Sequence, residues 1–394
     1  MKNILFIAPY AFPAWGYGGP PRINHDLAIH LTKAGNKVEF YTTDALSEKR
    51  NFKATETIQN ITIKRFKNIN NWLAWNYKIF VPIGFARALK ANIKRFDFVF
   101  LSDFRNYQNI IAFRFCQKYK IPYCLAAYGS IPIPHGLKKY IKQVIDAIWT
   151  KRMVAGASFL LGQTEHEKKL YCKYQADQSR CKIFPLGINL KYFKQSKINT
   201  RLFRKKYDIK SYKNIILYIG RINRLKGIDF LIKSMPEIIK LIPDAQLLII
   251  GRDDGYYLKT LQNMIVNLKL KMYVKIIGPL YETDNYPAYK IAKIFVFMPR
   301  HYEETSLACL ASLALGTPVI TNHQSSIPFL NKYKAGYEIS HDKDIYIKKL
   351  ISILKNHKLN NEMGNNGKKL IKNVFDISRV GKLLEQYIKE VLHE

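Results

Sequence analysis

Short apolar runs alternate with amphipathic stretches along the whole chain. The apolar runs read "NILFIAPY", "KVEFYTT", "FVFLS", "YCLAAY", "FLLGQ" and "KIFPLG" in the first half, then "NIILYIG", "AQLLIIG", "YVKIIG", "IFVFMP" and "PVIT". Helical patterns fill the intervals, including residues 106–118, 165–174, 228–241 and 258–268. Strands that are apolar throughout and alternate with helices are typical of parallel sheets covered on both faces. The pattern predicts an α/β protein with two Rossmann-like, doubly wound domains.

The length of 394 residues also favours two domains over one core. The polar stretch "KQSKINTRLFRKKYD", residues 194–208, is the expected joint. We therefore expect an N-terminal domain over residues 1–195, a C-terminal domain over 196–375, and a final helix over 376–394 that packs back on the first domain. Because doubly wound sheets bind ligands beyond the carboxyl ends of their strands, we expect the two domains to face each other across one cleft.

Three absences narrow the class of protein. No run of 18 or more apolar residues predicts a transmembrane helix. The opening "MKNILFIAPY" lacks the small-residue cleavage site of a signal peptide, so we interpret it as a first buried strand. The five cysteines are scattered without a C-x-x-C pair, which is typical of reduced thiols. We expect a cytoplasmic protein.

The net charge is strongly positive, at +35. Residues 1–200 hold 32 basic and 11 acidic side chains, and the remainder holds 32 and 18. Such a surface attracts polyanions, whether nucleic acid, anionic lipid or phosphate-rich substrates, although a lysine-rich composition alone is an alternative. No nucleic-acid recognition module accompanies the charge, so we do not expect nucleic acid as a partner.

A glycine-rich loop follows the first predicted strand. Gly16, Gly18 and Gly19 precede a helix that begins near Pro20. Glycine lets the backbone approach a ligand, and a helix N-terminus favours an anion, although a simple turn is an alternative. The loop is not G-x-G-x-x-G, and no acidic residue follows at the spacing needed for a ribose, which argues against a nicotinamide site.

Two cations stand at the start of the second predicted domain. In "YIGRINRLKGID", Gly220 ends a strand, and Arg221 and Lys226 lie in the loop before the next helix. Two cations at the carboxyl end of a strand suit the delocalised charge of a diphosphate. The alternative is two more solvated charges in a basic protein.

Four motifs in order resemble the family-4 retaining glycosyltransferases of the GT-B fold. They are "FPLGINLKYF", "GRINRLKGIDFLIKSM", "LLIIGRDDGYYLKTL" and "YEETSLACLASLALGTPVI". The resemblance covers nearly the whole chain, and its specific part is residues 220–320. It implies a hexosyltransferase-type enzyme that needs neither metal nor cofactor and uses a nucleoside-diphosphate sugar of the UDP or GDP type.

The resemblance also implies roles for individual residues. Arg221 and Lys226 would bind the donor diphosphate, Gly18 and Gly19 would close on the same phosphates, and Glu303 would contact the transferred sugar. Glu304 belongs to the donor-binding segment but stands where the family often has a small residue, so we interpret it as helix-start charge. The remaining donor-binding positions, which would meet phosphate or lie near the base, are Gly220, Gly251, Arg252, Pro279, Leu280, Thr305, Ser306 and Leu307.

Two positions depart from the family pattern. Ala311 stands where the family has a second Glu that accepts hydrogen bonds from the ribose, and Ser312 lies 100° around the helix. Tyr128 replaces a His near the reacting sugar, and His135 is the nearest His that could fold back. Losing a charged partner costs about 1.5–3 kcal/mol, which weakens a donor site without abolishing it.

The pair Asp253-Asp254 resembles a metal site, but the family uses that loop otherwise, so no metal is expected.

Two stretches of the first domain combine aromatic or aliphatic side chains with basic ones. "NNWLAWNYKIFVPIGF" contains Trp72, Trp75, Tyr77 and Phe80, and "GLKKYIKQVIDAIWTKR" places basic residues beside an apolar helical face. Both stretches suit attachment to an anionic membrane, with core-facing helices as the alternative.

We expect a glycan or polyprenyl-diphosphate-linked acceptor, in cell-surface polysaccharide or glycolipid synthesis at the inner face of the cytoplasmic membrane. The rival hypothesis is a non-catalytic, glycosyltransferase-like binding or scaffold protein with a decayed donor site.

Overall fold

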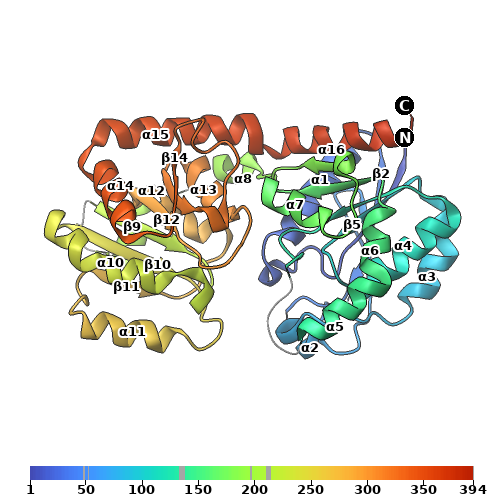
Figure 1. Ribbon diagram of the computed structural model, residues 1–394, viewed down its shortest axis with the longest axis horizontal. Coiled ribbons are helices and arrows are strands. Elements are labelled where there is room, and N and C mark those ends of the chain that lie inside the picture. Colours follow the sequence, from blue (N-terminus) through green and yellow to red (C-terminus); the bar gives the residue numbers. More distant parts are fainter. Residues whose placement is uncertain (48, 52, 133–137, 196–197, 210–213, 394) are drawn as a thin grey trace. The chain divides into compact units, whose positions relative to one another are not determined.

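The chain forms two compact units, each built around one sheet (Figure 1). The computed structural model describes residues 1–394 except 48, 52, 133–137, 196–197, 210–213 and 394. Residues 1–187 and 377–394 make the first unit, and residues 188–376 make the second. The chain crosses between units at Gly187–Ile188, so the stretch 194–208 that we expected to be a joint lies within the second unit.

The first unit contains an eight-stranded sheet in the order β3-β4-β2-β1-β5-β6-β7-β8. Its strands are β1 (Asn3–Ile7), β2 (Lys37–Thr43), β3 (Thr55–Ile58), β4 (Ile61–Phe66), β5 (Phe98–Ser102), β6 (Tyr123–Ala126), β7 (Phe159–Gly162) and β8 (Cys181–Ile183). All neighbours are parallel except β3, which pairs antiparallel with β4 at the edge. The central strands are buried on both faces, which explains their apolar runs.

The first unit also contains helices that connect these strands and the C-terminal helix α16. They are α1 (Pro20–Lys33), α2 (Asn71–Tyr77), α3 (Phe85–Asn92), α4 (Tyr107–Tyr119), α5 (Lys138–Ile145), α6 (Lys151–Ala155), α7 (Glu165–Cys172) and α16 (Ile377–Val391). A π-helical turn, Asp146–Thr150, joins α5 to α6. The last helix, α16, packs on α1, where a Cβ at Gly381 would lie 2.4 Å from His30 Cγ. Glycine at that position lets the two helices approach closely.

The second unit contains a six-stranded, fully parallel sheet in the order β11-β10-β9-β12-β13-β14. Its strands are β9 (Asn214–Ile219), β10 (Ala245–Ile250), β11 (Val274–Ile277), β12 (Ile294–Phe297), β13 (Val319–Asn322) and β14 (Gly336–Ile339). Its α-helices are α8 (Leu190–Gln195), α9 (Thr200–Lys206), α10 (Ile228–Leu241), α11 (Leu258–Asn267), α12 (Tyr286–Ile291), α13 (Leu307–Leu315), α14 (Lys343–Lys355) and α15 (His357–Leu370).

Strand order places a switch point in each sheet. The direction of winding reverses between β1 and β5 in the first unit and between β9 and β12 in the second. Doubly wound sheets bind ligands beyond the carboxyl ends of the strands at such a point. The loops that follow β9 and β12 are therefore the first place to look for a site in the second unit.

Close backbone contact holds the loops after β9 and β10 together. A Cβ at Gly251 would lie 1.8 Å from the carbonyl oxygen of Gly220, a separation that no side chain tolerates. Ile222 N donates to the Arg252 carbonyl at 2.7 Å, and Asp254 N donates to the Ile222 carbonyl at 2.9 Å. Glycine at position 251 is thus a steric requirement of this pairing.

We expect Gly251→Ala to lower the free energy of unfolding by about 1–3 kcal/mol, because the added methyl must push the two loops apart. Gly278→Ala is the matched control, since Gly278 also follows a strand of the same sheet and a Cβ there meets nothing within 4 Å. Urea unfolding measures both, and the control should stay within about 0.5 kcal/mol of wild type. Equal stability of the two variants would show that the loop pairing is not tight.

Candidate active site

The site in the second unit begins where β9 ends. Gly220 is followed by Arg221 and by a short 3-10 helix, Arg224–Lys226, after which Gly227 starts α10 in a left-handed conformation with φ 68°. A Cβ at Gly227 would lie 1.9 Å from the Met298 carbonyl oxygen, just beyond β12. The turn therefore brings the loops after β9 and β12 into contact and places Lys226 between them.

Lys226 forms an ion pair with Glu303 from the loop after β12. The lysine side chain is only 8% exposed and the glutamate 22%. Burial lowers the pKa of Lys226 from its ordinary value, and the neighbouring Glu303 carboxylate opposes that shift. The Nζ also lies 5.6 Å from the centre of the Phe297 ring. A cation is thus held at the switch point with little access to water.

Arg221 is more exposed and also has an acidic partner. Its Nη1 lies 2.9 Å from Oδ2 of Asp254, in the loop after β10. The adjacent Asp253 has a different task, because its Oδ1 accepts hydrogen bonds from the backbone N–H groups of Tyr257 and Leu258 at the start of α11. Within the described part of the chain, no cluster of three or more His, Cys, Asp or Glu side chains could hold a metal ion.

Hydrogen bonds to the segment after β13 fix the loop that carries Glu303. Glu303 N donates to the Gln324 carbonyl at 2.8 Å. Ser325 Oγ donates to the Glu304 carbonyl at 2.8 Å, and Thr305 Oγ1 donates to the Ser326 carbonyl at 3.0 Å. Three successive residues are thus held, which fixes the position of the Glu303 carboxylate relative to the sheet.

The interpretation of Glu304 as helix-start charge is wrong. Glu304 lies two residues before the N-cap of α13, outside its first turn, and is buried. Its backbone has φ 54°, which is uncommon for a residue with a side chain. The hydrogen bond from Ser325 holds this strained turn, which directs the chain from Glu303 into the helix.

Helix α13 begins after its N-cap, Ser306. The Ser306 side chain does not cap the helix, so the N–H groups of the first turn are available to an anion. Ala311 lies further along the helix and is partly exposed. Ser312 is fully buried and donates to the Thr317 carbonyl at 2.9 Å, so it cannot replace the missing carboxylate at position 311.

The other predicted donor-binding residues of this unit lie at neighbouring strand ends. Gly251 and Arg252 follow β10, while Pro279 and Leu280 follow β11, and Leu280 is partly exposed. Since β10 pairs in parallel with both β9 and β11, all of these loops open at one edge of the sheet. The second unit thus gathers Arg221, Lys226 and Glu303 at one switch point.

In the first unit, the glycine loop includes a 3-10 turn, Trp15–Tyr17, before α1. Gly18 has φ 104°, a conformation that favours glycine, and a Cβ there would meet nothing within 4 Å. Gly19 has an ordinary helical conformation as the N-cap of α1. Gly16 packs against Trp75, whose ring would lie 2.8 Å from an added Cβ. Glycine is therefore required at position 18 for its positive-φ backbone conformation and at position 16 for close packing against Trp75.

Tyr128 follows β6 with φ 51° and lies near the switch point of the first sheet. Its hydroxyl donates to Asn24 Oδ1 at 2.8 Å, and Asn24 Nδ2 donates to Ser102 Oγ at 2.7 Å. Burial raises the pKa of Tyr128 well above its ordinary value, so the phenol stays protonated. Tyr128 can donate a hydrogen bond but cannot supply the charge of the histidine that it replaces. His135 lies outside the described residues.

Sequence reasoning missed the partners of Tyr128 and Arg221, and also a hydrogen-bonded acidic residue that follows β5. Asn24 is a buried amide on α1. A polar residue on the buried face of a helix could have been used to predict a hydrogen-bonding role. Asp103 follows β5 with φ 71° and accepts a hydrogen bond from the Tyr10 hydroxyl at 3.2 Å. Asp254 was considered as a metal ligand, whereas the structure pairs it with Arg221.

Two family models match the chain, one over most of each unit. The model for "Glycosyltransferase Family 4" matches residues 17–192, and the model for "Glycosyl transferases group 1" matches residues 199–370. Together they span nearly all of the chain from the glycine loop to the end of α15.

Similar proteins agree with these matches. The uncharacterized glycosyltransferase MJ1607 of Methanocaldococcus jannaschii is 22% identical over 82% of this chain and 83% of its own length. Sucrose-phosphate synthase from Thermosynechococcus elongatus superimposes with a TM-score of 0.80 at 18% identity, covering 100% of both chains. Alr3699/HepE of Anabaena, solved in complex with UDP and glucose, gives a TM-score of 0.76 at 12% identity over 99% of this chain and 100% of that one. At these identities the solved structures show a shared fold.

Proposed function

The chain belongs to the family-4 glycosyltransferases of the GT-B fold, and from that premise we propose that it is a retaining enzyme that uses a nucleoside-diphosphate sugar. The observation that carries the proposal is the group formed by Arg221, Lys226 and Glu303 at the switch point between β9 and β12. Two cations beside a helix N-terminus suit a diphosphate. UDP is the favoured nucleotide, because it is bound in the structure of the similar Anabaena protein.

In the proposed mechanism, the enzyme orients the acceptor and the donor and stabilises the charge on the leaving diphosphate. The acceptor hydroxyl attacks the anomeric carbon on the face from which the diphosphate leaves, and a departing phosphate oxygen takes the hydroxyl proton. Lys226 and Arg221 stabilise the negative charge that develops on the leaving diphosphate. Glu303, held by the hydrogen bond of its own backbone to Gln324, contacts the transferred sugar. In this scheme neither a carboxylate nucleophile nor a metal ion is required, in contrast to the carboxylate pairs of glycosidases.

The ion pairs of the site indicate how the phosphates would be admitted. Lys226 is paired with Glu303 and Arg221 with Asp254, so each cation already has a carboxylate partner. A diphosphate that binds Arg221 must compete with Asp254, which is only partly buried. Asp254 therefore weakens nucleotide binding while keeping the Arg221 guanidinium oriented.

For the acceptor, we propose a glycan or a polyprenyl-diphosphate-linked glycan, met at the inner face of the cytoplasmic membrane. The support is the positive charge of the first unit, which attracts phosphate-bearing molecules. Among the described residues, no helix is both long and apolar enough to cross a bilayer. Attachment would therefore be peripheral, in the synthesis of a surface polysaccharide or glycolipid.

A second candidate function is binding without transfer. It is favoured by Ala311 and Tyr128, which leave the ribose and the reacting sugar without the charged partners of the family pattern. The two candidates differ in turnover: an enzyme releases UDP from UDP-glucose when an acceptor is present, and a binding protein does not. The ion pairs that hold Arg221 and Lys226 favour the enzyme, because a decayed site has no need of them.

Arg221→Ala should weaken UDP binding at least tenfold, since it removes a charged hydrogen-bond donor worth about 1.5–3 kcal/mol. Asp254→Asn should act in the opposite direction and tighten UDP binding, because Arg221 loses its competing partner. Arg224→Ala, a neighbouring exposed arginine on the same turn, is the matched control and should leave the affinity unchanged. Calorimetric titration with UDP measures the affinity of all three variants. Weaker binding by Asp254→Asn would contradict the proposal that Asp254 competes with the diphosphate for Arg221.

Ala311→Glu should tighten UDP binding by about tenfold, because one charged acceptor regained for the ribose is worth roughly 1.5 kcal/mol. Position 311 is partly exposed, so the longer side chain can be accommodated. Ala314→Glu is the control, which adds the same charge one turn further along α13 at another partly exposed position. The same titration measures both variants. If neither variant, or only Ala314→Glu, gains affinity, position 311 does not face the ribose.

A further inference from the structure

Exposed apolar side chains of the first unit gather in two segments. Among its described residues, every large exposed hydrophobic residue other than Met1 falls within residues 69–83 or 140–148. They are Ile69, Trp72, Tyr77, Ile79 and Ile83 in the first segment, and Tyr140, Val144 and Ile148 in the second. Figure 1 places α2 and α5, which carry or adjoin these residues, at the same lower edge of the unit. Single exposed hydrophobic residues are normal, whereas such a gathering indicates an interaction surface.

The exposed charge around both segments is positive, because Asp146, the one acidic residue within them, is buried and paired with Arg105. Residues 57–96 contain eight basic side chains and no acidic one, and residues 104–145 contain seven basic side chains and no acidic one. Lys67, Lys78 and Arg87 are exposed close to the first segment, and Lys151 and Arg152 are exposed just beyond the second. The surface therefore offers apolar contact together with positive charge, which complements an anionic partner.

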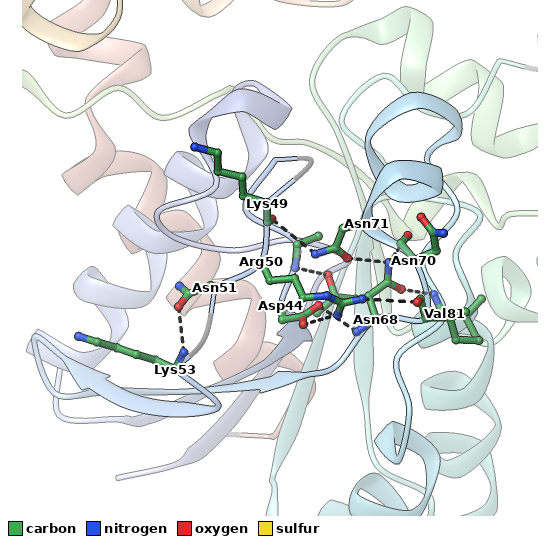
Figure 2. Close-up of polar contacts among 12 residues, drawn as sticks. Asp44, Lys49, Arg50, Asn51, Lys53, Asn68, Asn70, Asn71 and Val81 are labelled. Carbon is green, nitrogen blue, oxygen red and sulfur yellow. Dashed lines mark hydrogen bonds and ion pairs between the residues drawn. The ribbon is translucent and has the colours of Figure 1, made fainter.

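A polar network holds the base of the first segment (Figure 2). Asp44 accepts from Arg50 Nη1 at 2.6 Å and from the Asn68 backbone N–H at 2.9 Å. Asn68 in turn accepts from the Val81 backbone N–H at 2.7 Å, and its amide donates to Asn71 Oδ1 at 3.1 Å. Because Asn68 directly precedes the segment and Val81 lies near its other end, the network closes the segment into a loop and anchors that loop to the end of β2.

The interior of the loop is packed as well. Asn70 caps α2 by accepting from the Leu73 N–H at 3.0 Å. Trp75 makes an edge contact with Tyr17 at 5.1 Å between ring centres, and Phe80 is buried. Of the four aromatic residues expected to meet a membrane, these two therefore point inward, whereas Trp72 is 55% and Tyr77 is 46% exposed. The exposed side chains project from a loop that is ordered in advance of binding.

We propose that residues 69–83 and 140–148 form one docking surface for a bilayer that contains anionic phospholipid. This inference rests on the proposed function, in that it specifies the surface through which the enzyme reaches a membrane-borne acceptor. Trp72 and Tyr77 lie at the interface, where aromatic rings are favoured, and the flanking lysines and arginines meet the headgroups. Neither segment exposes an acidic side chain, since Asp146 is buried, and the contact is therefore selective for negative lipid.

Cosedimentation with vesicles tests the docking surface. The full chain should bind vesicles of phosphatidylglycerol mixed with phosphatidylcholine, bind weakly to pure phosphatidylcholine, and dissociate as salt rises. Trp72→Ser should weaken binding to the anionic vesicles about tenfold, and Lys67→Gln about fivefold. Tyr256→Ser is the control, because Tyr256 is 94% exposed on the second unit and should not affect vesicle binding.

Titration with UDP separates this inference from the proposed function. Trp72→Ser should bind UDP as wild type does, which also shows that the variant is folded. Vesicle binding without UDP binding would overturn the proposed function and leave the docking surface standing. Equal binding of Trp72→Ser and wild type to anionic vesicles would overturn the docking surface, as would a concentration-dependent dimer that this substitution abolishes.

Discussion

The buried ion pair between Lys226 and Glu303 is the constraint around which the second unit is arranged. An ammonium group that is cut off from water needs an acidic partner, since an unpaired buried charge costs several kcal/mol. The structure meets this need by bringing the loops after β9 and β12 together, through the close approach of Gly227 to the Met298 carbonyl. Arg221 and Asp254 repeat the arrangement nearer the surface. Two carboxylates, Glu303 and Asp254, thus have the role that we propose for the phosphates of a donor.

Much of the fold could be predicted from the sequence, because strands buried on both faces are apolar throughout. Strands β1 and β9 follow that rule. Strands β3 and β4 escaped prediction because they form an antiparallel pair at the sheet edge, and β4 alternates buried residues with partly exposed ones such as Lys64. The joint at 194–208 was misplaced because polar surface helices resemble a linker in composition.

The candidate site was only partly predictable, for a physical reason. Spacing and family resemblance identify Arg221, Lys226 and Glu303, but not which carboxylate each cation pairs with. The pairing of Arg221 with Asp254 and of Tyr128 with Asn24 depends on chain segments that meet only in the folded protein. The buried position of Glu304 likewise depends on hydrogen bonds to a segment about 20 residues later, so its charge alone suggested a simpler role.

The most direct test of the account is a calorimetric titration of the wild-type chain and of Lys226→Met with UDP and GDP. Methionine keeps most of the side-chain volume and removes the charge, so the loops should remain packed while the anion site is lost. We expect wild type to bind UDP with a dissociation constant in the millimolar range or below, and Lys226→Met to bind it at least tenfold more weakly. Wild-type protein that binds neither nucleotide at millimolar concentration, or a Lys226→Met variant with unchanged affinity, would contradict the claim that this ion-pair site receives the donor diphosphate.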